Sequence, residues 1–332
     1  MSIKKSFNLL LVICGYILSR ITRKVIHWGN PVSLSIEPTN SCNLHCPECP
    51  SGQHILTREK GFITEDLFRR IISQLNKSIF YLTFYFQGEP YLHPGFTRMI
   101  KIARSGNIFV STSTNGHYLG TENARSTVDS GLNKLIVSLD GTDQESYSSY
   151  RAGGSFEKVT EGIREVIRQK KKAGSSKPCV ILQFLVLKTN EHQVREIKAL
   201  GKRLGVDAVE IKKAQFYDFE NGNPLMPVNP EYSRYSATET VSGEKHYRIR
   251  NNMPNHCFRM WSSCVITWDG WVVPCCFDKD ATYRMGNINV EPFEQIWRNE
   301  KYRDFRRKLL HKRKSIDICT NCTEGTGLSR II

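Results

Sequence analysis

Short apolar runs alternate with longer helical stretches between residues 32 and 213, and this alternation limits the fold more than any other feature. Runs of this kind predict strands that are buried on both faces, as in a parallel sheet. We expect strands at 33–37, 79–86, 108–113, 134–139, 179–187 and 207–212, with helices at 64–76, 94–105, 120–131, 155–173 and 190–204. Six strand–helix units are too few to close an eight-stranded barrel. We therefore predict an α/β fold built as a partial, open (β/α)6 TIM-like barrel.

Three cysteines, Cys42, Cys46 and Cys49, follow the first predicted strand with the spacing C-x3-C-x2-C. Three thiolates on one loop can hold three irons of a cubane cluster. The loop offers no fourth ligand, so one iron would stay open, as in catalytic metal sites. A zinc knuckle normally needs four ligands, and a disulfide needs an oxidising compartment. The spacing therefore favours an iron–sulfur cluster over both alternatives.

Four motifs follow the cysteine loop along the chain, and together with the loop they form a recognisable series. They are Gln87-Gly88-Glu89-Pro90, Thr114-Asn115-Gly116, Ser138-Leu139-Asp140-Gly141, and Arg151 within Tyr150-Arg151-Ala152-Gly153-Gly154. Together with the cysteine loop they resemble the radical S-adenosylmethionine (SAM) superfamily over residues 32–215. Two positions depart from that pattern: Glu48 stands where an aromatic residue is frequent, and Gln87 where glycine is usual. Active sites of such folds gather at the carboxyl ends of the strands, where these motifs fall.

The resemblance implies a 4Fe–4S cluster on Cys42, Cys46 and Cys49, with SAM bound to its open iron. It also implies a set of SAM contacts along the strand ends. These are Gly88 and Glu89 for the amino group, Ser113 and Asn115 near the ribose, Ser138 and Asp140 for the ribose hydroxyls or the methionyl end, and Arg151 for the carboxylate. Each residue alone has an ordinary structural explanation, such as a turn, a surface charge or a helix N-cap. The set behind the cysteine loop favours SAM binding.

A second group of cysteines lies near the C-terminus at Cys257, Cys264, Cys275, Cys276, Cys319 and Cys322. Residues 255–325 resemble the Twitch domain, the short form of the SPASM extension. The resemblance implies an auxiliary 4Fe–4S cluster on Cys257, Cys275, Cys319 and Cys322, and a single such cluster. Structural zinc in four-sulfur coordination suits the same residues. Cys264 and Cys276 are alternative ligands, and an Asp269-Gly270 hairpin turn would bring Cys257 and Cys275 near each other.

The chain of 332 residues is expected to divide into four parts. Residues 1–31 form an N-terminal apolar helix, 32–216 the barrel, 217–256 a bridging segment, and 257–332 the small iron–sulfur domain. The apolar run from Phe7 to Leu18 is too short to span a bilayer and lacks a signal-peptide cleavage site. We expect a helix packed on the barrel, or an interfacial helix whose basic flanks meet anionic lipid through residues 7–24. The predicted location is cytoplasmic, with contact at the inner face of the membrane as the alternative.

These features predict an oxidoreductase-like radical SAM enzyme. It would cleave SAM to a 5′-deoxyadenosyl radical, abstract hydrogen from an unknown small-molecule or lipid-linked substrate, and use the auxiliary cluster in a net oxidation. An electron donor such as flavodoxin or ferredoxin is implied. The alternatives are a peptide-modifying maturase of the same superfamily and a non-enzymatic zinc scaffold. The net charge of +15 fits an anionic substrate, an acidic partner or a membrane surface. The basic helix near 303–314 is expected to be a solvated face, without nucleic-acid binding.

Overall fold

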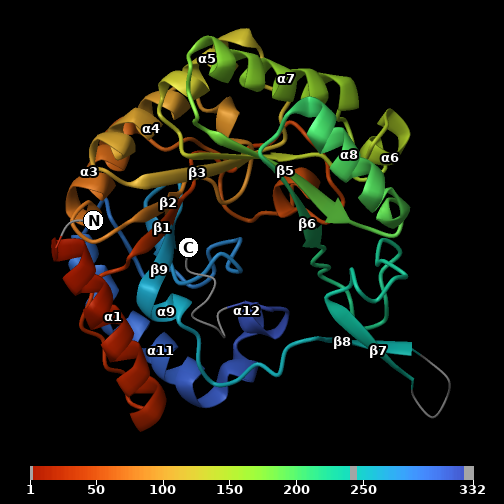
Figure 1. Cartoon of the computed structure of the whole chain (residues 1–332). Helices are drawn as coiled ribbons and strands as arrows, with labels where there is room; N and C mark the ends of the chain where they lie inside the picture. The colour runs from red at the N-terminus through yellow and green to blue at the C-terminus, as the bar shows by residue number, and fades with distance from the viewer. Residues whose placement is uncertain (1–2, 240–244, 325–332) are drawn as a thin grey trace.

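The computed structural model describes residues 3–239 and 245–324, and its core is a parallel sheet with helices along its outer side (Figure 1). The barrel strands are β1 (Ser33–Ile36), β2 (Tyr81–Thr83), β3 (Phe109–Thr114), β4 (Lys134–Ser138), β5 (Cys179–Val186) and β6 (Ala208–Lys213). The covering helices are α3 (Glu65–Leu75), α4 (Phe96–Ser105), α5 (Thr121–Asp129), α7 (Phe156–Lys172) and α8 (Val194–Leu204). Each of these strands pairs in parallel with the next. The predicted partial barrel is confirmed.

Side chains alternate along the first two strands between the helices and the inside of the barrel. Leu34, Ile36 and Leu82 are fully buried in the main hydrophobic core with the helices. The residues between them carry hydroxyl groups and line a cavity inside the barrel: Ser33, Ser35, Tyr81 and Thr83. Barrel interiors are usually filled with branched apolar side chains. This barrel therefore has an unusually polar interior on the side of β1 and β2.

The C-terminal region continues the barrel sheet instead of forming a separate one. Strand β9 (Ser263–Ile266) lies parallel to β1, and β10 (Trp271–Val273) and β11 (Gly286–Asn287) extend the sheet beyond it. The result is a nine-stranded sheet in the order β11-β10-β9-β1-β2-β3-β4-β5-β6. The predicted hairpin is confirmed, with Gly270 at φ +89° in the turn between β9 and β10. Helices α9 (Arg259–Ser262), α10 (Phe293–Arg298), α11 (Glu300–Lys312) and α12 (Asp317–Thr320) complete this region.

A buried ion pair joins the end of β1 to the segment after the first cysteine loop, and a backbone hydrogen bond joins it to this hairpin. Arg58 donates two hydrogen bonds to the Glu37 carboxylate, at 2.6 and 2.7 Å. The Trp268 backbone N–H donates a third, at 3.2 Å. Since Glu37 and Arg58 are both buried, this pair fixes the strand that leads into the first cysteine loop.

The N-terminal helix α1 (Ile3–Thr22) is longer than the apolar run that predicted it. It packs on the C-terminal region, where the Tyr16 ring lies 5.1 Å from that of Phe258 and 5.6 Å from that of Trp261. The Tyr16 hydroxyl also lies 3.0 Å from His256 Nδ1. By length and composition alone α1 is apolar enough to cross a membrane, with a mean hydropathy of 1.2. One face of the helix is thus packed, but its ring contacts are with the C-terminal region, whereas the sequence suggested the barrel.

The bridging segment contains a two-stranded antiparallel ribbon, β7 (Tyr235–Glu239) and β8 (Lys245–Ile249). Other residues of the segment contact the first cysteine loop. Asn223 Nδ2 donates to the Glu48 carboxylate at 2.9 Å, and the Tyr217 N–H donates to it at 3.3 Å. The carboxylate at this unusual position therefore anchors the bridging segment to the loop.

Candidate active site

Three cysteines and six of the predicted SAM contacts border one cavity of about 110 Å³ at the carboxyl ends of β1 to β4. We call it the cysteine-loop cavity. Its lining contains Cys42, Cys46 and Cys49 together with Gly88, Glu89, Ser113, Asn115, Ser138 and Arg151. These residues come from five separate segments of the chain. The residues fit the predicted 4Fe–4S cluster with bound SAM, because three thiols border one cavity together with polar groups suited to SAM.

The Gln-Gly-Glu-Pro turn packs directly on the cysteine loop. Gly88 has φ +73°, and a Cβ atom there would lie 2.5 Å from the Ser41 carbonyl oxygen. The Glu89 N–H donates to that same carbonyl at 2.8 Å. Only glycine combines this backbone conformation with so close an approach. The turn and the cysteine loop are therefore held as one unit.

The Glu89 carboxylate is buried and already accepts three hydrogen bonds. Its Oε1 accepts from the Thr114 hydroxyl at 2.7 Å and from the Tyr91 N–H at 3.1 Å. Its Oε2 accepts from the Asn115 N–H at 2.7 Å. Burial raises the pKa of Glu89, while these donors oppose the increase. Since a carboxylate has about four acceptor positions, Oε2 keeps one for a ligand amino group.

Asp140 lies behind Arg151 and outside the cavity lining. Its Oδ2 accepts from Arg151 Nε at 2.6 Å, and its Oδ1 accepts from the Leu185 N–H at 2.6 Å. Asp140 thus holds Arg151 in position. Direct contact of Asp140 with SAM, which the sequence suggested, stays a prediction. Arg151 Nη1 lies 3.8 Å from Cys46 Sγ. The pKa of the Cys46 thiol is raised by burial and lowered in part by this guanidinium, with burial the larger effect.

The four predicted auxiliary ligands, Cys257, Cys275, Cys319 and Cys322, line a second cavity. Cys264 and Cys276 are not part of that lining, so the cavity favours the predicted set over its alternatives. Burial raises the pKa of Cys319 to about 12 and that of Cys322 to about 11. All eleven cysteines are free. Over residues 3–239 and 245–324, no three His, Cys, Asp or Glu side chains are grouped so as to hold a single metal ion.

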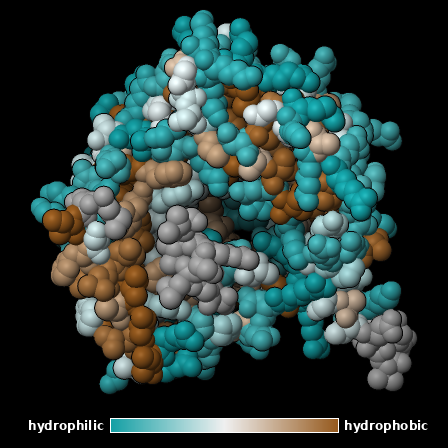
Figure 2. Space-filling view, in the orientation of Figure 1, coloured by the Kyte–Doolittle hydropathy of each residue, from teal (hydrophilic) through white to brown (hydrophobic). Residues whose placement is uncertain are grey.

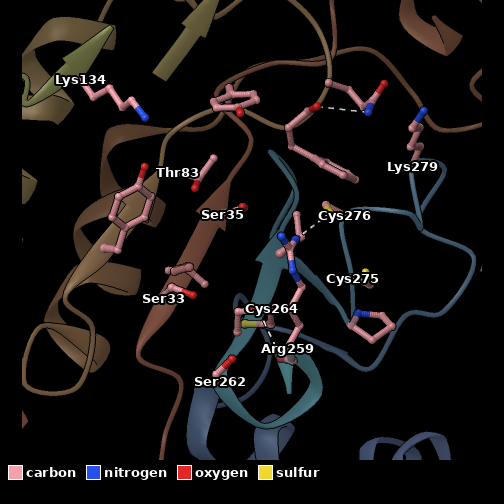
Figure 3. Close-up of a pocket in the computed structure, with 18 residues that line it drawn as sticks. Ser33, Ser35, Thr83, Lys134, Arg259, Ser262, Cys264, Cys275, Cys276 and Lys279 are labelled. Atoms are coloured by element: carbon pink, nitrogen blue, oxygen red, sulfur yellow. Dashed lines mark hydrogen bonds between the residues drawn. The ribbon is translucent and has the colours of Figure 1, made fainter. Parts of the chain in front are cut away.

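A third and larger cavity of about 470 Å³ lies inside the barrel, and we call it the lumen cavity (Figure 3). It shares Tyr85 with the cysteine-loop cavity and Cys275 with the auxiliary cavity. Sequence reasoning missed Tyr85, Arg259 and Lys279, all of which line it. Hydroxyl residues at alternate positions of the first two predicted strands were a signal for its polar wall. No local pattern marked Arg259 or Lys279.

The sequence model of the radical SAM superfamily matches residues 36–201, which is half of the chain. The chain belongs to the radical SAM superfamily. A second model, of the SPASM iron–sulfur cluster-binding domain, matches residues 257–323. The cofactors of this enzyme are therefore a 4Fe–4S cluster, SAM and auxiliary iron–sulfur clusters. The alternative of a non-enzymatic zinc scaffold is set aside.

Individual relatives within this superfamily have different activities. The tungsten-containing aldehyde ferredoxin oxidoreductase cofactor-modifying protein of Pyrococcus furiosus is 27% identical over 327 residues, covering 87% of this chain and 86% of the relative. The mycofactocin maturase MftC of Mycobacterium ulcerans is 27% identical over 311 residues, covering 88% of this chain and 80% of the relative. Among solved structures, BtrN in complex with AdoMet and 2-DOIA superposes with a TM-score of 0.54 at 20% identity, covering 89% of this chain and 94% of BtrN. The first two support the general chemistry, and the third supports the fold.

Proposed function

We propose that this radical SAM enzyme oxidises a small molecule held in the lumen cavity. The observation that carries the proposal is the position of that cavity between the other two. Tyr85 belongs to the walls of both the lumen and the cysteine-loop cavities, and Cys275 to those of both the lumen and the auxiliary cavities. A substrate in the lumen would thus be close both to the source of the radical and to an acceptor for an electron.

The residues that would hold the cofactors follow from the two smaller cavities. Cys42, Cys46 and Cys49 would hold the SAM-binding cluster, and Cys257, Cys275, Cys319 and Cys322 the auxiliary cluster. When bound, these groups supply one-electron cleavage of SAM to methionine and a 5′-deoxyadenosyl radical, and an acceptor for the second electron of the substrate. The substrate would lose one hydrogen atom to the 5′-deoxyadenosyl radical, which would become 5′-deoxyadenosine. It would then lose one electron to the auxiliary cluster and one proton, which balances as a two-electron oxidation.

The chain's own residues would bind and orient SAM. Glu89 would accept a hydrogen bond from the amino group through its remaining Oε2 position. Arg151, held by Asp140, would pair with the carboxylate through its terminal nitrogens, since its Nε is already bonded. Asn115 Nδ2 is bonded to the Asn43 side chain at 2.8 Å, which keeps its amide beside the cysteine loop. Ser113 and Ser138 would contact the ribose or the methionyl chain from the ends of β3 and β4.

The proposal is tested by anaerobic reconstitution with iron and sulfide, followed by reduction, addition of SAM and assay of 5′-deoxyadenosine. Wild type should bind about eight irons and form 5′-deoxyadenosine. A Cys42→Ala/Cys46→Ala/Cys49→Ala variant should keep about four irons and form none. A Cys319→Ala/Cys322→Ala variant should still cleave SAM but lose the net oxidation. Absence of 5′-deoxyadenosine from the fully loaded wild type would refute the radical mechanism for this chain.

Peptide modification is the second candidate, and the similarity to a PqqA peptide cyclase of Streptomyces rochei favours it. A volume of about 470 Å³ lies within the range of pockets for small ligands. A peptide would have to enter with one side chain while its backbone stayed outside.

Electron delivery by a flavodoxin or ferredoxin is part of either proposal, and replacing dithionite by either protein in the assay tests it.

We further propose that α1 contacts the inner face of a membrane rich in anionic lipid. Its packed face leaves an apolar stripe in solvent, formed by Ile3, Phe7, Leu10, Ile17 and Ile21, and Figure 2 shows this apolar band at the lower left of the molecule. The exposed cations Lys4, Arg20, Arg23 and Lys24 flank the stripe. An amphipathic helix of this kind binds at the lipid interface through apolar burial and attraction to anionic headgroups.

Co-sedimentation with vesicles tests this contact. Wild type should bind vesicles of phosphatidylcholine with phosphatidylglycerol and bind pure phosphatidylcholine weakly. A Phe7→Ser/Ile21→Ser variant should lose most of the binding, whereas Val290→Ser, at another exposed apolar residue, should not. Self-association of the wild type without vesicle binding would show that a second copy covers the stripe and would overturn the membrane contact.

A further inference from the structure

The lumen cavity has a charge pattern that its position alone does not explain. Among the described residues that line it, three carry cationic side chains, Lys134, Arg259 and Lys279, and none is Asp, Glu or His. Figure 3 shows Lys134 and Lys279 on opposite sides of the cavity, with the guanidinium of Arg259 between them. A concave site lined by one sign of charge concentrates ligands of the opposite sign.

The three cations differ in how far protein carboxylates already neutralise them. Lys134 lies 3.4 Å from Glu210, and Arg259 lies 3.4 Å from Glu324. Within residues 3–239 and 245–324, Lys279 has no carboxylate within 4.0 Å. Its ammonium instead lies 4.8 Å from the centre of the Tyr217 ring. Burial lowers the pKa of Lys279, so a bound anion would favour its charged form.

The wall of the cavity that β1 and β2 form is rich in hydroxyl groups. Ser33 and Ser35 of β1 and Tyr81 and Thr83 of β2 face the lumen at alternate positions, and Tyr85 continues the row. Their side-chain oxygens make no hydrogen bond with other described residues. By contrast, the hydroxyls of Ser262 and Ser263 donate hydrogen bonds to nearby backbone carbonyls. A hydroxyl donates and accepts, so this wall suits a ligand with several hydroxyls of its own.

We propose that the lumen cavity binds a small anionic polyol, a molecule with several hydroxyls and a phosphate or carboxylate group. The anionic group would lie against Lys279 and Arg259, and the hydroxyls would bond to the side chains of β1 and β2. This inference rests on the proposed function, since it names the chemical class of the substrate for the same enzyme. It disfavours an apolar or cationic substrate.

Binding is measured by isothermal titration calorimetry on the reconstituted enzyme with SAM present. The probes are glucose 6-phosphate, gluconate and glucose, which share hydroxyls but differ in charge. Either anionic probe, or both, should bind at least about tenfold more tightly than glucose, which is the gain in affinity expected from one charge-assisted hydrogen bond. The anion that binds identifies phosphate or carboxylate as the recognised group. Equal binding of all three probes, or of none, would overturn the proposal.

Two variants and a control locate the site. Lys279→Gln should remove the preference for the anionic probe, and Thr83→Val should weaken all polyols without altering the charge preference. Lys101→Gln removes one exposed lysine of α4 and should leave binding unchanged. Iron content and thermal melting confirm that each variant is folded, and if Lys279→Gln is unfolded, Arg259→Gln replaces it. An unchanged charge preference in the folded lysine or arginine variant would place the anion elsewhere.

The failure of this inference can be distinguished from that of the proposed function. Formation of 5′-deoxyadenosine by wild type without any probe measures SAM cleavage alone. Cleavage without selective anion binding would refute the anionic polyol and leave the radical chemistry. Selective anion binding without cleavage would keep the site and refute the chemistry.

Discussion

Replacement of the buried Glu37 by glutamine should destabilise this protein more than the same substitution of a surface glutamate. The exposed fractions of the Glu37 and Arg58 side chains are 0% and 3%, so neither charge is solvated by water. The glutamine would keep one acceptor oxygen, but its amide would face a guanidinium donor. Removing one partner of a buried pair costs about 3–5 kcal/mol, because the other charge stays buried and uncompensated. That is a large share of a typical unfolding free energy of about 5–15 kcal/mol.

Equilibrium unfolding in urea under reducing, anaerobic conditions measures the effect. Glu161→Gln is the matched control, since Glu161 pairs with Arg164 at 3.1 Å while their side chains are 69% and 55% exposed. The control should cost less than about 1 kcal/mol. A Glu37→Leu/Arg58→Met double variant should be more stable than Glu37→Gln, because it removes both charges. A cost below about 1 kcal/mol for Glu37→Gln, or a double variant that is less stable, would refute the reasoning.

Three further outcomes are expected. Cys275→Ala should lose the auxiliary cluster, about four irons, whereas Cys276→Ala should retain it, as iron analysis will show; the opposite result would exchange the two assignments. Gly88→Ala should abolish SAM cleavage, because its Cβ would lie 2.5 Å from the Ser41 carbonyl oxygen; an active variant would contradict the close packing. Burial lowers the pKa of His27 to about 2, so the unfolded chain alone takes up that proton below pH 6.5. Stability should therefore fall as the pH drops below 6.5, by about 1.4 kcal/mol per pH unit from this group; urea unfolding at pH 7 and 5 should show a smaller loss for His27→Gln.

Much of the barrel could be predicted because its elements depend on local patterns. The strand expected at 179–187 is found at Cys179–Val186, and the helix expected at 155–173 is found at Phe156–Lys172. The strand expected at 79–86 is shorter, Tyr81–Thr83, since the chain beyond it leaves the ladder for the turn around Gly88. Apolar composition alone does not show where backbone pairing ends.

Other features depend on contacts between distant segments, which no local pattern contains. The pairing of β9 with β1 joins Ser33 to Ser263. The role of Asp140 is a similar case. The sequence identifies a carboxylate at the end of a strand, but only the fold shows that it meets Arg151 and the backbone of Leu185. The sequence thus predicts which residues lie near the site more fully than it predicts where each side chain points.

The place of β9 beside β1 also affects the order in which the enzyme is assembled. During synthesis β1 and the cysteine loop leave the ribosome long before β9, so β1 is an open sheet edge until the C-terminal hairpin docks. The Trp268 bond to Glu37 forms at the same late step. We therefore expect the first cysteine loop to be most accessible to the cellular machinery for cluster insertion before the C-terminal region has folded. Maturation of the two clusters should proceed in sequence, with the SAM-binding cluster inserted first.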